Sequence, residues 1–287
     1  MTQIASLADI LRLEPIEVNL FRGYTPMSGM KSTRIFGGQV IAQALVAAYN
    51  TVEARPCHSL HAYFLRPGDP TAPVLYEVER ARDGKSFATR RVTAIQHGEQ
   101  IFNLSASFQH EEAGFEHQIR PPETPPADEF SDELESRTAA AAKLPAALGE
   151  ALLRERPIEM RRVEQREWID PTPSEGGQRY WFRARAGFGE GVAMQQAVLA
   201  YASDMMLLSS TLIPHGLSWM DPTVQMASLD HAIWFHRPSD MRTWHLYVVD
   251  SPSTQASRGF TRGEIFTSEG VLVASVCQEG LIRRRTR

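Results

Sequence analysis

One acidic side chain in the sequence stands among apolar neighbours. Asp204 lies in the run 202–208, which reads Ala-Ser-Asp-Met-Met-Leu-Leu. An ionised carboxylate is costly to bury unless it is paired or hydrogen-bonded. Two interpretations stay open. Asp204 lies at a solvent edge or near a helix end, or it is held in a dry pocket where it can polarise a water molecule or accept its proton.

Two further polar side chains adjoin apolar strand candidates. Ser228 directly precedes the segment 229–236, and Gln278 follows the apolar stretch that ends at Cys277. A serine in such a place is commonly a turn or cap hydroxyl, and the glutamine could be a surface amide at a strand end. None of these polar residues would be singled out alone.

Several other chemistries find no support in the sequence. The Gly-Lys-Ser segment 84–86 lacks the glycine five residues earlier that a phosphate-binding loop requires, and no Gly-x-Ser-x-Gly occurs. The nine histidines show no metal-ligand spacing beyond His58/His61 and His231/His236, which read as ordinary strand histidines. We therefore expect no metal and no cofactor.

Composition limits the class of protein. The 287 residues carry 30 Lys+Arg against 34 Asp+Glu, a net charge of -4 that does not favour nucleic acid as a partner. The two cysteines, Cys57 and Cys277, do not indicate a disulfide scaffold. No apolar run reaches the ~18 residues of a membrane span, and the first twelve residues do not resemble a signal peptide. We expect a cytoplasmic protein without stable membrane association.

The chain changes composition once. Residues 121–137 are rich in proline and acidic side chains, as in an exposed linker, and 138–156 then favours a helix that ends before Pro157. We therefore predict three parts: an N-terminal domain over 1–115, a linker with a connecting helix over 116–156, and a C-terminal domain over 157–287.

The two halves resemble each other. Phe-x-Arg-Pro occurs at 64–67 and again 171 residues later at 235–238, and each half has one long apolar helix candidate, 36–48 and 194–208. Strand candidates follow each helix, and they are 60–65, 74–82, 87–96, 101–109, 229–236, 243–249, 259–267 and 271–282. Periodicity alone supports a duplicated α+β fold.

The sequence resembles the acyl-CoA thioesterase II family, the double hot-dog acyl-CoA thioesterases, over essentially its whole length. The segments that carry the resemblance are 34–39, 61–68, 83–92, 107–109, 201–204, 228–231, 234–238 and 276–280. The resemblance implies an α+β fold of two tandem hot-dog domains, each a long central helix wrapped by an antiparallel sheet. It also implies hydrolysis of acyl-CoA to a fatty acid and CoA.

The resemblance further implies a catalytic set of aspartate, serine or threonine, and glutamine, which falls here on Asp204, Ser228 and Gln278 in the C-terminal domain. Such side chains can hold one water molecule by three hydrogen bonds, so we expect Asp204 to accept its proton and the other two to orient it. We expect no acyl-enzyme, backbone N–H groups as oxyanion donors, and a homo-oligomer, because hot-dog sheets leave edges that pair between subunits.

The first half lacks a matching carboxylate, since no Asp or Glu occurs between Lys31 and Asn50. We therefore predict one active site per chain. Candidates for the acyl slot are Met205, Met206, Leu207, Phe36 and Trp234, and candidates for the CoA phosphates are Arg66, Arg90, Arg91 and Arg237.

Two alternative functions remain. A hot-dog enoyl-CoA hydratase or dehydratase would pair a histidine with a carboxylate, for which Asp230-His231 is the adjacent pair, although neighbours on a strand point to opposite faces. A non-catalytic acyl-CoA-binding protein would bind the thioester and release no thiol.

Overall fold

A computed structural model describes residues 5–26, 33–131, 133–153, 156–169, 171–175, 177–185 and 187–285. The strands of its first half are β1 (Leu13–Glu17), β2 (Leu20–Gly23), β3 (Cys57–Phe64), β4 (Val74–Asp83), β5 (Phe87–Gln96) and β6 (Glu99–Gln109). Those of its second half are β7 (Ile158–Arg162), β8 (Gln178–Ala184), β9 (Val224–Ser228), β10 (Asp230–Phe235), β11 (His245–Gln255), β12 (Arg258–Thr267) and β13 (Leu272–Arg284). The helices are α1 (Leu7–Leu11), α2 (Gly37–Tyr49), α3 (Glu133–Ala141), α4 (Ala146–Leu153) and α5 (Val192–Ser203), with the 3-10 helices η1 (Ala127–Glu129) and η2 (Leu208–His215).

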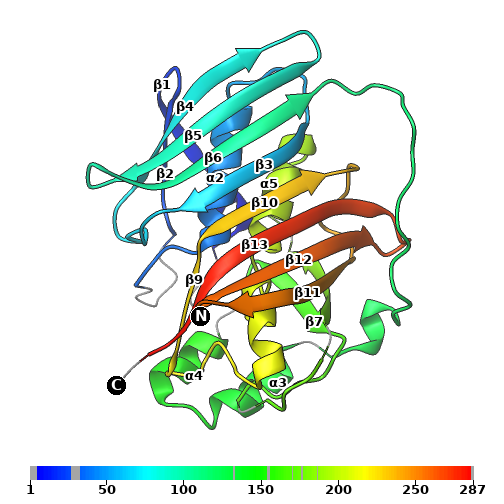
Figure 1. Ribbon diagram of the computed structural model, residues 1–287. Helices are drawn as coiled ribbons and strands as arrows, with labels where there is room; N and C mark the ends of the chain where they lie inside the picture. The colour runs from blue at the N-terminus through cyan, green and yellow to red at the C-terminus, as the bar shows by residue number, and fades with distance from the viewer. Residues whose placement is uncertain are drawn as a thin grey trace.

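All strands of the described residues belong to one antiparallel sheet, with α2 and α5 side by side against one face (Figure 1). The order is β1-β2-β4-β5-β6-β3-β10-β13-β12-β11-β8-β7, and β9 pairs with β13 outside this path. The order is mirrored about the β3–β10 pair, because β4-β5-β6-β3 on one side corresponds to β11-β12-β13-β10 on the other. The duplicated hot-dog arrangement expected from the sequence is therefore confirmed.

The two halves share one hydrophobic core. The antiparallel pairing of β3 with β10 places Tyr63 opposite Asp230 and Ser59 opposite Trp234, so the two half-sheets are continuous. Helices α2 and α5 are apolar nearly all round, and their residues join strand residues of both halves in a single buried cluster. This packing brings the start of α2 to the end of α5, which positions the candidate site.

Some elements differ from the predictions. The helix predicted over 194–208 ends at Ser203, and the helix predicted over 138–156 is two helices, α3 and α4, with Pro145 directly before α4. Residues 154 and 155 of that prediction lie outside the described residues. Five short strands, β1, β2, β7, β8 and β9, were not predicted. The segment between β6 and η1 is an extended connection along the outside of the sheet (Figure 1).

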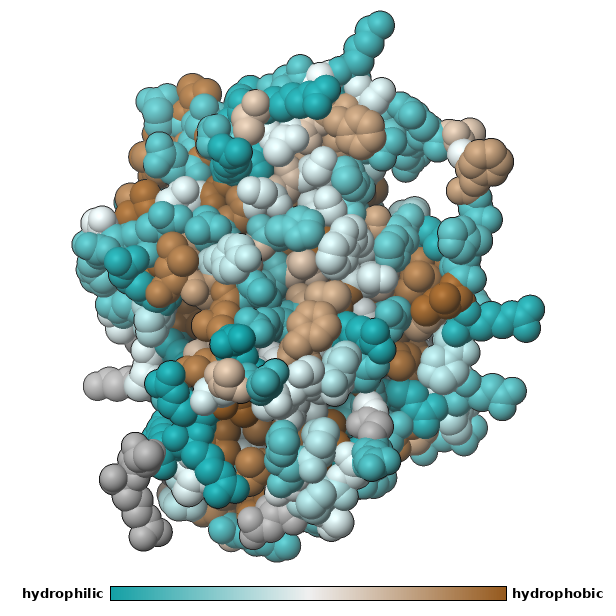
Figure 2. Space-filling model, viewed as in Figure 1, coloured by the Kyte–Doolittle hydropathy of each residue, from teal (hydrophilic) through white to brown (hydrophobic). Residues whose placement is uncertain are grey.

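The surface viewed from the sheet side is largely polar. Side chains that are hydrophilic or of intermediate hydropathy cover most of this face, with hydrophobic side chains between them (Figure 2).

Among the described residues one helical stretch, 192–215, is long and apolar enough to cross a membrane by length and composition. Its most apolar window is 72% buried inside the fold, as expected for a core helix.

Candidate active site

Asp204 terminates α5 as its C-cap residue, with φ -80° and ψ -12°. The helix cannot continue regularly because Met206, two residues later, adopts a positive φ of 64°. Beyond this turn the hydroxyls of Ser209, Ser210 and Thr211 each donate to the carbonyl three residues earlier, at 2.6 to 2.7 Å, within the 3-10 helix η2. Asp204 therefore lies at a helix end, as one interpretation of the sequence allowed, but its side chain is only 6% exposed.

Two glycines let the start of α2 approach this carboxylate. The Gly38 N–H donates to Asp204 Oδ2 at 2.8 Å. A Cβ at Gly37 would lie 2.8 Å from the same oxygen, and a Cβ at Gly38 would lie 2.5 Å from the Tyr201 carbonyl oxygen. Only glycine fits this close crossing of two helix ends, and the positive end of the α2 dipole then faces the carboxylate.

Gln278 and Ser228 reach the site from neighbouring strands. Gln278 of β13 is fully buried, and its Nε2 donates to Asp204 Oδ1 at 2.8 Å. Ser228, the last residue of β9, is paired with Gly280 of β13, so it lies on the same sheet face as Gln278, two positions away. The structure thus joins Asp204 to Gln278 directly and places Ser228 and Asp204 on the wall of one cavity. In the described part of the chain, neither the Ser228 hydroxyl nor Gln278 Oε1 has a hydrogen-bond partner.

Burial controls the acidity of this carboxyl group. Desolvation raises the pKa of Asp204 to about 6, against the hydrogen bonds from Gln278 and Gly38, which lower it because they stabilise the anion. At neutral pH the group is mainly ionised, yet it binds a proton far more readily than an exposed aspartate. These properties suit a general base.

The sequence led us to consider His231 with His236 and with Asp230, but in the structure it packs against Asp204. Its Nδ1 lies 3.9 Å from Asp204 Oδ1, and its side chain is fully buried. Asp230 instead accepts the Glu279 N–H at 2.6 Å on the opposite side of the strand. No sequence pattern indicates that His231 and Asp204 are close, because their contact depends on how α5 ends above β10.

A cavity of about 550 Å³ opens beside Asp204, within the range of small-molecule sites. Its wall combines both halves of the chain, with Phe36, Val40 and Phe64 from the first half and Leu208 and Ser228 from the second half among its lining residues. The cavity is therefore lined mainly by apolar side chains, and Asp204 and Ser228 form its polar end.

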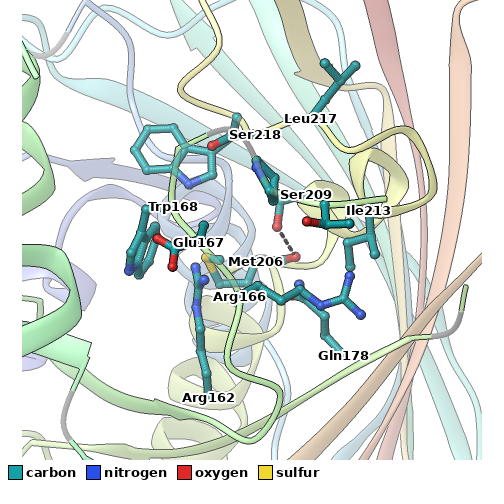
Figure 3. Close-up of a pocket in the computed structure, with 13 residues that line it drawn as sticks. Arg162, Arg166, Glu167, Trp168, Gln178, Met206, Ser209, Ile213, Leu217 and Ser218 are labelled. Atoms are coloured by element: carbon teal, nitrogen blue, oxygen red, sulfur yellow. Dashed lines mark hydrogen bonds between the residues drawn. The ribbon is translucent and has the colours of Figure 1, made fainter. Parts of the chain in front are cut away.

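Of the five residues predicted for the acyl slot, Phe36 alone lines this cavity. Met205 and Leu207 are buried in the core, and Trp234 packs edge-on to His61 with ring centroids 5.2 Å apart. Met206 lies in the turn after α5 and lines a different pocket (Figure 3). The acyl slot predicted from the sequence therefore coincides with this cavity only at Phe36.

The candidate phosphate-binding arginines also separate. Of the four predicted arginines, Arg66 lines the cavity and pairs with Glu99 at 2.8 Å, and Arg34, which was not predicted, also lines it. Arg90 is 1% exposed and bound to Asp83, so it is structural. Arg91 pairs with Glu79 at 3.6 Å on the first half-sheet, and Arg237 lines a separate cavity of about 390 Å³.

The pocket drawn in Figure 3 is too small for an acyl-CoA, because its volume is about 40 Å³. Trp168 and the Arg162 guanidinium stack beside it, with 3.5 Å from the guanidinium carbon to the ring centroid. This pocket is therefore not a candidate for the substrate site.

Comparison with known proteins gives the context of this site. The sequence is 40% identical over 97% of both chains to "Acyl-CoA thioesterase 2" of Haemophilus influenzae. It is 41% identical to human "Acyl-coenzyme A thioesterase 8", over 96% of this chain and 88% of the human protein. The chain belongs to the acyl-CoA thioesterase family.

Other comparisons agree with this family. The family model described as "Acyl-CoA thioesterase N-terminal domain" matches residues 26–109, and the model described as "Acyl-CoA thioesterase" matches 152–281, which include Asp204, Ser228 and Gln278. The crystal structure of the acyl-CoA thioesterase II TesB2 from Mycobacterium marinum is 40% identical, with a TM-score of 0.79 over 98% of this chain and 99% of that chain. A hot-dog protein from Alicyclobacillus acidocaldarius at 18% identity, with a TM-score of 0.77, supports the fold alone. As a family member, the chain is a thioester hydrolase.

Proposed function

We propose that this chain hydrolyses acyl-CoA thioesters to a fatty acid and CoA with a water molecule held by Asp204, Gln278 and Ser228. The observation that carries the proposal is the buried carboxylate at the polar end of an apolar cavity, bound by Gln278 Nε2 and the Gly38 N–H. The carboxylate and the two partner-free oxygens, Gln278 Oε1 and Ser228 Oγ, provide the hydrogen-bonding groups that position one water molecule.

The reaction follows from these positions. As water attacks the thioester carbonyl carbon, its O–H bond breaks and the proton passes to Asp204. Collapse of the tetrahedral intermediate breaks the C–S bond. The proton of Asp204 then passes to the departing thiolate, which restores the carboxylate and leaves a fatty acid and a thiol.

The developing oxyanion needs separate donors, because Gly38 N–H and Gln278 Nε2 are bound to Asp204. Gly37 is the first residue of α2 and lines the cavity, so its N–H has no intrahelical partner. We assign the carbonyl oxygen of the thioester to this N–H, where the helix dipole favours negative charge.

The alternatives are weaker on geometry. A hydratase would use a histidine that reaches the substrate, whereas His231 is fully buried behind Asp204 and does not line the cavity. Ser228 has no base hydrogen-bonded to its hydroxyl among the described residues, which disfavours it as a nucleophile. A non-catalytic binding protein would have no use for a buried carboxylate of raised pKa.

The cellular setting is part of the proposal. We infer a cytoplasmic enzyme without stable membrane association, supported by a largely polar surface on the viewed face (Figure 2). We also infer a homo-oligomer, because the sheet ends at β1 and β7 leave backbone groups that another subunit can pair. The domain boundaries predicted at residues 115 and 156 belong to the same proposal.

The decisive assay is thiol release from short-, medium- and long-chain acyl-CoAs by the wild type and Asp204→Asn. The wild type should release thiol, and the variant should lose about 10²-fold or more, the scale of general-base help. Because we propose one active site per chain, Asp204→Asn should lose nearly all thiol-release activity. A variant that kept about half of the wild-type activity would contradict the proposal. Mass spectrometry of the intact protein should show no acylated serine during turnover.

A further inference from the structure

His231 is a fully buried histidine that the proposed reaction does not use. Because Ala232 of β10 pairs with Cys277 of β13, the preceding His231 lies beside Gln278 on the sheet face toward α5. Its Nδ1 points to Asp204 Oδ1 at 3.9 Å. That nitrogen has no hydrogen-bond partner among the described residues, which is uncommon for a buried polar atom.

The hydrogen bonds of Ser203 favour one of the two neutral forms of the His231 ring. Ser203 Oγ donates its single hydrogen to the Ala200 carbonyl at 3.0 Å and lies 2.9 Å from His231 Nε2. With this hydrogen given to Ala200, Ser203 Oγ can only accept from the ring, so we assign the ring hydrogen to Nε2. Burial lowers the pKa of His231 to about 3, so the ring is neutral and Nδ1 presents a bare lone pair. Two acceptors thus face each other at a distance too long for a hydrogen bond.

We propose that His231 is a positioning residue that accepts a hydrogen bond from Asp204 when that carboxyl group is protonated during the reaction. The inference rests on the proposed function, in which Asp204 takes a proton from water. With this proton on Oδ1, the acid donates to His231 Nδ1, while Oδ1 still accepts from Gln278 and Oδ2 still accepts from Gly38. No proton moves to the ring, and the contact is broken again when the proton passes to the thiolate.

The hydrogen bond to His231 makes Asp204 a stronger base. A partner that stabilises the protonated acid and offers nothing to the anion raises the pKa of Asp204 and favours the proton transfer. The other titratable groups packed around this pair do not change charge near neutrality. Tyr247, which donates to the Ser203 carbonyl, has a pKa raised by burial well above 10, and burial raises the pKa of Tyr201 to about 12.

The test compares His231→Phe with wild type in the thiol-release assay across pH. Loss of one hydrogen bond to an acid formed on the reaction path should lower kcat about 10-fold, with KM unchanged. The acid limb of the kcat profile should move to lower pH, because Asp204 loses the acceptor that favours its protonated form. A merely structural role would not move this limb. The control is His236→Phe, which removes an exposed histidine bound to Ser275 and should leave both quantities unchanged.

An unchanged kcat and acid limb in folded His231→Phe would overturn the inference, and so would a limb that moves to higher pH, since the ring would then donate to the carboxylate. If Asp204→Asn stays active, it is the proposed function that fails. A second measurement needs no variant: ¹⁵N NMR of histidine-labelled wild type should show His231 with hydrogen on Nε2 and none on Nδ1. A protonated Nδ1 would refute the proposal even if His231→Phe does not fold.

Discussion

The carboxylate of Asp204, the general base of the proposed reaction, is buried at a cost in the stability of the fold. Burial raises the pKa of this group from 3.8 to about 6, so the folded chain binds the proton more tightly than the unfolded chain does. Stability associated with the protonated form is present below pH 4 and is lost as pH rises through about 6. A rise of this size corresponds to about 3 kcal/mol.

We therefore predict that Asp204→Asn is inactive and more thermostable than wild type at pH 7. The amide can keep the Gly38 contact through its oxygen, and Gln278 can turn its partner-free Oε1 toward the new NH₂. Calorimetry at pH 5 and pH 7 measures the effect. The advantage of the variant should grow over this interval, because only the wild type ionises a buried group there.

The same ionisation should limit catalysis at low pH. Since the base must be ionised, kcat/KM of the wild type should fall about tenfold per pH unit below about 6. The stability prediction has its own contradicting outcome. If Asp204→Asn were less stable than wild type by the same amount at pH 5 and at pH 7, ionisation of Asp204 would not lower the free energy of unfolding.

At the scale of elements, the site depends on the contact between the start of α2 and the end of α5. The two helix ends can approach closely because Gly37 and Gly38 have no side chains. Beside them, Phe36 packs edge-on to Tyr201 with ring centroids 5.1 Å apart. Neither helix carries the site alone, since one supplies the N–H groups and the other supplies the carboxylate.

Gly38→Ala tests this contact. Alanine normally stabilises a helix relative to glycine by up to about 1 kcal/mol. At this position its Cβ would lie 2.5 Å from the Tyr201 carbonyl oxygen, so we expect a loss of about 1–3 kcal/mol and a strong fall in kcat. Thermal melting and thiol release measure both effects.

Gly114→Ala is the matched control, because its Cβ would meet nothing within 4 Å and the residue lies in the exposed connection after β6. Gly114→Ala should have the melting temperature and the kcat of the wild type. If Gly38→Ala behaved in the same way, close approach of the helices would not be what places Asp204.

The elements that the sequence predicted are those with strong periodicity. The apolar helix 37–49 and strands such as Phe87–Gln96, which alternates exposed and buried residues, agree with the structure to within a few residues. Strand β1 was missed because its residues are mostly exposed and include Pro15, so no alternation marks it. The end of α5 was missed because a positive φ at Met206 is a tertiary constraint.

The site was predictable only in part for a similar reason. The resemblance selected Asp204, Ser228 and Gln278, and the structure brings them to one place. The Gly38 N–H is a backbone donor that no side-chain pattern reveals. His231 has a visible side chain, but its neighbour in space is 27 positions away in the chain, and that proximity requires the fold.

At the scale of the whole molecule, the two repeats contribute different parts of the site. Asn50 caps the end of α2, as Asp204 caps the end of α5, so the first repeat has an amide where the second has a carboxylate. The first half instead supplies most of the apolar wall, including Phe64 and Phe102, whose ring centroids are 5.2 Å apart. Substitutions in the two halves should therefore affect different kinetic parameters.

We predict that Phe64→Ala raises KM for long-chain acyl-CoA about tenfold and changes kcat little, because a lost apolar contact of roughly 1.4 kcal/mol affects binding of the chain rather than activation of the water. The effect should diminish for short acyl chains, which do not reach this wall. Steady-state kinetics with a series of chain lengths measures it.

Tyr63→Ala supplies the comparison within the same strand. Tyr63 is adjacent to Phe64 but points to the outer face, where it is 59% exposed, so its removal should leave KM unchanged for every chain length. If Phe64→Ala lowered kcat equally for all substrates, the first half would be acting on the chemistry. The apolar wall and the water site would then be one coupled unit instead of the contributions of two repeats.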